Sequence, residues 1–183
     1  MADETLQTPT NVAERIRIIA EALTDGIIII DNEEFHIPDH VFFKLELEEA
    51  YDDGESKFEI EVEIIWPLPI SDSIEDDIGK IDDTEWTLYY EAQLMTRENA
   101  ARRVLELSAQ VWGEQFSLGG HHVHLPPELE LEIETEAVAL PDDDEETDTD
   151  EENAEDVVQE STKLEIEISW KSWQLMSPSS IAQ

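Results

Sequence analysis

The sequence predicts an α+β fold of two tandem α-β-β-β-β units, each a helix packed on an antiparallel four-stranded sheet. Three observations lead to this prediction. The segments KFEIEVEIIW (57–66) and KLEIEISW (163–170) both alternate apolar residues with glutamate and both end in tryptophan. Each is preceded by short apolar segments separated by turn residues, and each half begins with apolar residues at helical spacing. Helices followed by a run of strands are typical of the α+β class.

The two halves of the chain align over roughly 40 residues without a gap, as expected of an internal repeat. His36 then lies over His124, and Pro38 lies over Pro126, 88 positions later. Trp66 lies over Trp170 only at an offset of 104, so the second copy carries an insertion of 16 residues. We expect the copies to associate as an intramolecular pseudo-dimer. The sequence leaves open whether their sheets pair edge to edge or their apolar faces meet.

The repeat sets the expected domain boundaries. The first unit covers 8–67 and the second 96–173, with an acidic loop insertion at about 141–160. A linker covers 68–95, and its segment EWTLYYEAQL (85–94) has the composition of one further strand. Residues 174–183 form a tail.

Each unit opens with an amphipathic helix. Apolar or small residues recur at steps of three and four at Val12, Ile16, Ile19, Ala20 and Leu23, and again at Ala101, Val104, Leu105, Ser108 and Val111. Thr8 is the expected N-cap of the first helix, with Pro9 at its first position and Gly26 after its end. Thr96 and Gly113 take the corresponding places around the second helix.

Four strands are expected after each helix. Short strands at 27–30 and 34–37 flank Asp31-Asn32, and strands at 115–118 and 122–125 flank Gly119-Gly120, which suits a tight hairpin. Longer strands follow at 41–48 and 58–66, with the turn DDGE between them. Their alternation places apolar residues on one face and charged residues on the other.

The alternation predicts a dense layer of carboxylates on the solvent side of both sheets. Glutamates should lie opposite glutamates, with Glu59, Glu61 and Glu63 facing Glu46 and Glu48, and with Glu165 and Glu167 facing Glu132 and Glu134. Like charges directly across a sheet are unfavourable by ~0.2–1 kcal/mol per pair. We therefore expect stability to depend on K⁺ or other cations. The closing residues Trp66 and Trp170 are expected to be structural anchors in the core or at its edge rather than binding residues.

The charge balance excludes several partners. The chain has 48 Asp and Glu against 10 Lys and Arg, a net charge of −38. Such a surface repels nucleic acids and anionic lipids, so we expect no direct nucleic-acid binding and no membrane binding. Because the Debye length is about 3 Å at 1 M salt, a salt-rich cytoplasm would screen the self-repulsion, and the composition is halophile-like. With no cysteine, no signal peptide and no apolar run of membrane length, we expect a cytoplasmic protein.

An amphipathic α-β-β-β-β unit that ends in a charged, alternating strand with a closing tryptophan resembles the amphi-Trp domain, a small family found often in halophilic archaea. The resemblance covers residues 8–66, with a more divergent second copy at 96–170. It implies the fold, but no activity, because the family has no established one.

Chemistry is weakly indicated. His122 and His124 share one strand face with His121 at the adjacent turn, a pattern that can hold a metal ion together with a carboxylate. Adventitious nickel or zinc binding explains the pattern better than a physiological metal site, so no metal or cofactor is expected. Nucleophile-elbow, phosphate-loop and dinucleotide motifs are missing from the sequence, and we expect no enzyme activity.

The resulting hypothesis is a non-catalytic, acidic protein-interaction or scaffold module with an unknown protein partner. A docking segment is expected at Trp173, Leu175 and Met176, although the same residues could fold back on the core. One alternative is an acidic nucleic-acid mimic that binds a DNA-binding protein. A second alternative is a His-dependent metal-binding protein. Self-association into a homo-oligomer is compatible with each of them.

Overall fold

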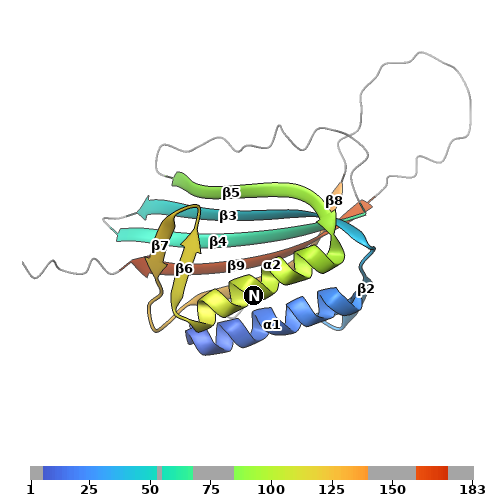
Figure 1. Cartoon of the computed structure of the whole chain (residues 1–183), viewed down its shortest axis with the longest axis horizontal. Coiled ribbons are helices and arrows are strands. Elements are labelled where there is room, and N and C mark those ends of the chain that lie inside the picture. Colours follow the sequence, from blue (N-terminus) through green and yellow to red (C-terminus); the bar gives the residue numbers. More distant parts are fainter. Residues whose placement is uncertain (1–5, 53–54, 68–84, 140–159, 173–183) are drawn as a thin grey trace, which may run out of the picture.

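The computed structural model describes residues 6–52, 55–67, 85–139 and 160–172. Two layers make up the fold: two helices packed side by side cover one face of a five-stranded antiparallel sheet (Figure 1). The helices are α1 (Pro9–Asp25) and α2 (Arg97–Trp112). The sheet has the order β5-β3-β4-β9-β8, formed by β5 (Glu85–Thr96), β3 (His40–Asp52), β4 (Glu55–Trp66), β9 (Glu160–Ser172) and β8 (Glu130–Ala139).

The predicted α+β class is confirmed, but the prediction of two four-stranded sheets is wrong. The short strands form separate two-stranded hairpins, β1 (Ile27–Ile30) with β2 (Glu33–His36), and β6 (Gln115–Leu118) with β7 (His121–His124). The long strands of both halves instead join in one sheet through β4 and β9. This pairing satisfies the backbone groups of two long edges that separate sheets would leave open.

The seam between β4 and β9 is also the centre of the hydrophobic core. Ile60 lies opposite Ile168, and Ile64 lies opposite Leu164, and all four side chains are fully buried. Burying such a side chain contributes about 1.5–3 kcal/mol. The alternation of the two strands therefore accounts for their pairing, because one apolar row from each meets under the helices.

The helix boundaries follow the predicted caps. The Thr8 hydroxyl accepts a hydrogen bond from the Asn11 amide at 3.3 Å, and the Thr96 hydroxyl accepts one from Asn99 at 3.2 Å. Gly26 ends α1 with φ 79°, a left-handed conformation that glycine adopts at low cost.

The two helices are also joined by a hydrogen bond. The buried Ser108 hydroxyl donates to the Ala13 carbonyl at 2.7 Å. One residue of the predicted apolar stripe on α2 is misplaced: Leu105 is 47% exposed, and Leu107 is buried in the core instead. The spacing alone could not separate these positions, because both lie at the borders of the stripe.

Both hairpins turn at the predicted residues. Asp31 and Asn32 have φ 52° and 66°, and Gly119 and Gly120 have φ 55° and 83°, the positive values that tight two-residue turns require. In the linker region, the structure has strand β5 where the sequence predicts one further strand, and β5 leads directly into α2. The predicted acidic insertion lies outside the described residues, apart from Glu160 at the start of β9.

Candidate functional site

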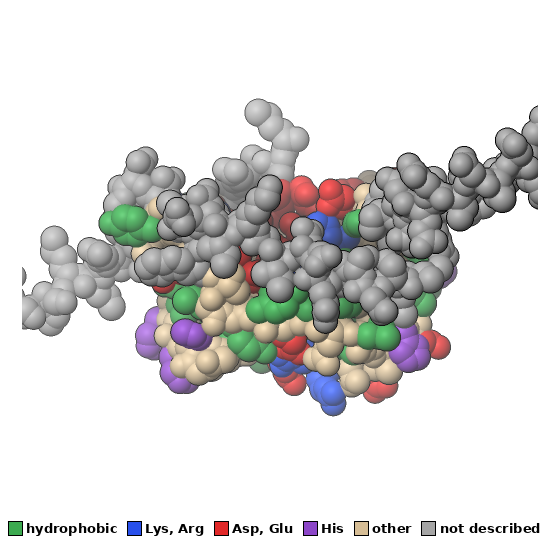
Figure 2. Space-filling view, turned by 90° about the horizontal axis from the view of Figure 1, so that it is seen from above, with side chains coloured by type: hydrophobic (Ala, Val, Ile, Leu, Met, Phe, Trp, Pro, Cys, Tyr) green, Lys and Arg blue, Asp and Glu red, His purple; other side chains and the backbone are tan. Residues whose placement is uncertain are grey.

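The face of the five-stranded sheet that points away from the helices is lined by glutamate, and we call it the carboxylate face. It follows directly from the alternation, because every second residue of β3, β4, β8 and β9 points away from the core. Its acidic residues are Glu46, Glu48, Glu59, Glu61, Glu63, Glu130, Glu132, Glu134, Glu136, Glu165 and Glu167. In Figure 2, acidic side chains with basic ones beside them are visible near the top of the picture, between the grey segments.

The carboxylates form rows that run across the strands. One row consists of Glu46, Glu61, Glu167 and Glu132, each directly opposite the next. The register confirms that Glu61 faces Glu46 and Glu59 faces Glu48, and that Glu167 and Glu165 face Glu132 and Glu134. Glu63 differs from the prediction, since it lies opposite Lys44 instead of a glutamate. The pairing of β4 with β9 extends the glutamate pairs, since it also places Glu61 opposite Glu167, which the sequence did not predict. The result is one continuous acidic surface instead of two.

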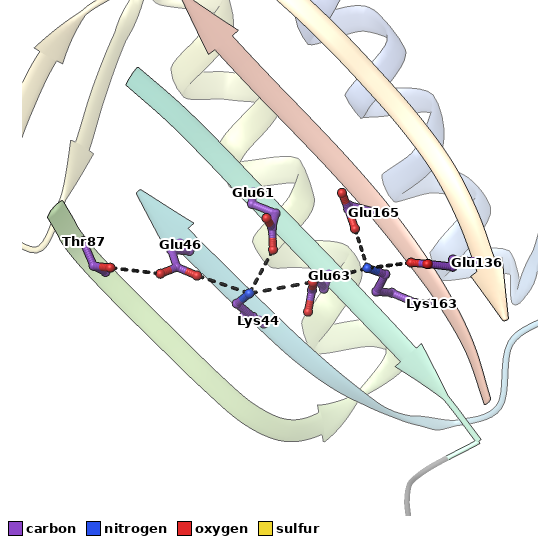
Figure 3. A network of polar contacts seen from close by, with 8 residues as sticks. All are labelled: Lys44, Glu46, Glu61, Glu63, Thr87, Glu136, Lys163 and Glu165. Carbon is purple, nitrogen blue, oxygen red and sulfur yellow. Dashed lines mark hydrogen bonds and ion pairs between the residues drawn. The ribbon is translucent and has the colours of Figure 1, made fainter. Parts of the chain in front are cut away.

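Lysines offset part of this negative charge, and sequence reasoning missed their role. Lys44 on β3 reaches three carboxylates, with its Nζ 2.9 Å from Glu61, 3.2 Å from Glu46 and 3.7 Å from Glu63 (Figure 3). Burial by itself opposes the charge on Lys44, but these carboxylates raise its pKa overall. The sequence did contain a signal of this role, because lysines interrupt the alternation of apolar residues with glutamate.

A second lysine extends the network across the sheet. Lys163 on β9 lies 2.6 Å from Glu165, 2.9 Å from Glu136 on β8, and 3.6 Å from Glu63 on β4. Glu63 thus joins the contacts of both lysines, while the Thr87 hydroxyl on β5 donates to Glu46 at 3.1 Å (Figure 3). Polar contacts therefore connect all five strands on this face.

Two carboxyl groups of this face are hard to ionise. Burial raises the pKa of Glu63 to about 7, with Glu61 adding to the effect and Lys44 opposing it. Burial, followed by the negative charge of Glu59, likewise raises the pKa of Glu167 to about 7. The pKa of Glu61 shifts in the opposite direction. Burial by itself would raise it, but the hydrogen bond from Lys44 contributes to lowering it overall. The centre of the carboxylate face therefore combines carboxyl groups that bind protons readily with one that stays ionised.

The predicted anchors lie in the core. Trp66 and Trp170 are 5% and 4% exposed. Trp66 is the last residue of β4, and Trp170 lies near the end of β9. The Trp66 ring meets Phe35 edge-on at 6.4 Å between centroids, and Trp170 stacks between Phe58 and Phe116 at 5.7 and 5.9 Å. Both tryptophans therefore hold a small hairpin against the large sheet.

The histidine candidates lie at one end of the molecule, on the β6–β7 hairpin. His121, His122 and His124 are all exposed, and His122 Nδ1 contacts the Ser117 hydroxyl at 2.8 Å. Figure 2 shows histidines at both ends of the molecule, near the two hairpins. In the part of the chain that the structure describes, no three His, Asp or Glu residues group in a way that could hold a metal ion. Trp173, Leu175 and Met176 lie outside the described residues.

Comparison with family models, curated proteins and solved structures gives no match for this chain. Among the helices of the described residues, none has the length and apolar character needed to cross a bilayer.

Proposed function

We propose that the chain is a non-catalytic protein-interaction module that binds a cationic surface of a partner protein through the carboxylate face. The observation that carries this proposal is the continuous set of glutamate rows across β3, β4, β9 and β8. No helix or strand among the described residues packs on this face. A like-charged surface of this kind costs folding free energy, and a basic partner would relieve that cost on binding.

The same proposal includes the tandem architecture. The chain consists of two related units that associate as a pseudo-dimer, with β4 and β9 as the contact strands and the two helices side by side. Support comes from the matched sheet positions, since β3-β4 lies on one side of the seam and β9-β8 on the other. The similar burial of Trp66 and Trp170 supports the resemblance of both units to the amphi-Trp family. Joining two units extends the acidic surface across the seam, from β3 and β4 to β9 and β8, for one partner.

Affinity purification from the native host at its own salt concentration tests the proposal. We expect the tagged full chain to recover a recurrent, stoichiometric basic protein. A variant with Glu59→Gln and Glu167→Gln should lose this partner, because both substitutions neutralise the middle of the carboxylate face. The control is Glu33→Gln with Glu114→Gln, which removes at least as much charge from exposed positions at the start of β2 and just before β6, and should retain the partner. A clean preparation without a partner would refute the proposal.

The acidic nucleic-acid mimic is a second candidate, favoured by the regular spacing of the rows. Neighbouring strands are about 4.8 Å apart, and alternate residues along a strand are about 6.8 Å apart, so the carboxylates form a dense anionic lattice. A mimic would occupy the nucleic-acid groove of its partner. Duplex DNA should then displace the chain from the purified partner, whereas an ordinary basic partner would remain bound.

A further inference from the structure

The edge strand β5 and the residues just before α1 occupy equivalent places in the two halves of the fold. An offset of 88 positions relates Gln7 to Met95 and Val41 to Leu129. Met95 pairs with Val41 in the sheet, and Gln7 pairs with Leu129. Two backbone hydrogen bonds of 2.8 Å close the second pair, one from each amide to the carbonyl of the other residue. The chain before α1 therefore meets the start of β8 in the register in which β5 meets β3.

This register can be continued towards the N-terminus. The ladder between β5 and β3 runs on without interruption for six positions beyond the Met95–Val41 pair. In the same register, Thr5 comes opposite Leu131, and Asp3 comes opposite Ile133. Residues 1–5 are therefore the equivalent of the part of β5 that covers the edge of β3.

The apolar side chains of β8 are less covered than their equivalents in β3. Phe43 and Leu45, which lie beside β5, are 1% and 4% exposed. Leu131 and Ile133 take the equivalent positions in β8 and are only partly buried against the core. A strand in the register of Gln7 would remove further apolar surface of both side chains from water, which favours its docking.

Two side chains of β5 hold that strand against the second helix and hairpin. Glu91 pairs with Arg103 of α2 at 2.5 Å. The Tyr89 ring lies against the β6–β7 turn, where a Cβ on Gly119 would be 2.6 Å from it. One carboxylate and one large side chain, two residues apart, thus fix this edge strand on the helix side of the sheet.

A groove lies at the equivalent place beside β8. Its volume is about 510 Å³, and its lining comes from α1, from β1 with its turn, and from Ile133 of β8. Ile18, Ile27 and Ile29 in this groove are 53%, 42% and 66% exposed. Exposed aliphatic side chains gathered in a groove form an apolar docking surface.

Residues 1–5 match this groove in charge and polarity. The offset of 88 places Asp3 at the position of Glu91 and Met1 at the position of Tyr89. Arg15, which lines the groove, takes the position of the arginine that pairs with Glu91. In the register of the bridge, the segment therefore brings a carboxylate to an arginine and an apolar side chain to the exposed isoleucines.

The same register adds one unfavourable contact on the carboxylate face. Glu4 comes opposite Glu132, whereas the equivalent pair on the other side of the sheet is Ala92 with Lys44. Like charges directly across a sheet oppose pairing. The two neighbouring acidic residues of the segment therefore have opposite effects, since Asp3 favours docking and Glu4 opposes it.

We infer that residues 1–5 of this chain occupy the groove and pair with β8 as a sixth strand of the sheet. Asp3 forms an ion pair with Arg15, and the segment covers Leu131 and Ile133. The large sheet is then bordered on both sides by equivalent strands, each leading directly into one of the two helices. Glu4 also adds a position to the glutamate row on the carboxylate face. This inference concerns the chain itself and does not depend on the proposed interaction function.

Amide hydrogen exchange resolved by residue with NMR tests this pairing. Hydrogen-bonded pairs alternate along antiparallel strands, so the bridge at Leu129 directs the amides of Leu131 and Ile133 towards residues 1–5. In a variant lacking residues 2–5, these two amides should exchange at least about fivefold faster than in the native chain, as for loss of a hydrogen bond. The amides of Glu132 and Glu134 point towards β9 and should keep their native rates.

Two variants with the same change of charge at adjacent residues separate strand docking from general charge effects. They are compared at the lowest KCl concentration at which the native chain is fully folded. Asp3→Lys removes the carboxylate from Arg15 and should speed exchange of the two amides about twofold to fivefold, the range of a surface ion pair. Glu4→Lys replaces the repulsion from Glu132 by attraction and should slow the same exchange. Adding Arg15→Asp to Asp3→Lys should restore the native rates.

Native exchange rates at Leu131 and Ile133 in the variant lacking residues 2–5 would overturn the inference. Equal changes in the Asp3→Lys and Glu4→Lys variants would also overturn it, because only the net charge would then matter. Protection that depends on protein concentration would do the same, because a second copy of the chain would then occupy the edge of β8.

Discussion

The two faces of the five-stranded sheet are built from the same strands and have opposite energetic roles. On the helix side, Ile60, Ile64, Ile166 and Ile168 meet across the β4–β9 seam with no exposed surface. On the other side, Glu61 and Glu63 alternate with them and lie opposite Glu167 and Glu165. The apolar face therefore determines the fold, while the opposed glutamates of the carboxylate face are expected to lower its stability. In the proposed interaction function, this costly surface is the one that binds the partner.

The largest expected effect is on the apolar face. Ile166→Ala removes a fully buried side chain from the seam and should lower the free energy of unfolding by about 2–5 kcal/mol. Glu167→Gln changes the next residue, on the other face, and should not destabilise the protein at neutral pH. Urea unfolding of both variants in molar KCl measures the difference. Equal destabilisation by the two changes would contradict the division of roles.

Salt should relieve the repulsion on the carboxylate face and leave the packing of the apolar face unchanged. Molar KCl screens the repulsion between opposed glutamates, and with ~0.2–1 kcal/mol for each pair the native protein should gain about 2–4 kcal/mol over dilute buffer. Thermal unfolding across a KCl series measures this gain. A melting temperature that stays flat between dilute buffer and molar KCl would show that the glutamate rows carry no net repulsion.

Among the basic residues of this face, Lys44 should contribute most to the free energy of unfolding. Lys44→Met leaves Glu46, Glu61 and Glu63 without their shared partner and should cost about 1–3 kcal/mol in dilute buffer, less than for a fully buried ion pair. The control is Lys171→Met, whose side chain is 71% exposed and which should change stability by less than about 1 kcal/mol. Similar losses of stability in the two variants would show that the Lys44 network has no special role.

The pH dependence should be inverted relative to a protein stabilised by its carboxylates. Glu63 and Glu167 have folded pKa values of about 7 against an ordinary value of 4.5, so their ionisation disfavours the folded state. This penalty is fully present above pH 7 and disappears as the pH falls towards 4.5. Stability should therefore rise by about 1–2 kcal/mol between pH 8 and pH 5, after allowance for solvent screening.

The gain should reverse at lower pH. The pKa of Glu61 and that of Glu91 are lowered overall, because hydrogen bonds from Lys44 and Arg103 outweigh their burial. Their stabilising contribution is lost as the pH falls through these lowered values. Urea unfolding between pH 3 and pH 8 should show a maximum near pH 5. A steady rise in stability up to pH 8 would contradict the raised pKa values.

The local structure was predictable from the sequence because an alternating strand can turn its apolar residues to only one of two faces. Once Ile60 and Val62 are placed in the core, Glu59, Glu61 and Glu63 must face outward, and the hairpin turn fixes their partners on β3. The helix caps and tight turns were predictable for a similar reason, since threonine, proline and glycine have narrow backbone preferences.

The assembly of the sheet was not predictable in the same way. The strands β3, β4, β8 and β9 have nearly the same pattern, so alternation cannot decide which edges meet. The pairing of β4 with β9 depends on how the helices pack above them. The partners of Lys44 and the groove beside Arg15 depend on that pairing, and residue types alone could not indicate them.

Replacing the two hard-to-ionise carboxylates tests the central claim most directly. The claim is that the carboxylate face opposes folding and is retained for binding. The measurement is the free energy of unfolding at pH 8 in dilute buffer for the native chain and for the Glu63→Gln, Glu167→Gln variant. The account predicts that the variant is more stable by about 1–2 kcal/mol, because two disfavoured charges are removed without loss of shape. A variant less stable than the native chain would show that these glutamates stabilise the fold and would contradict the claim.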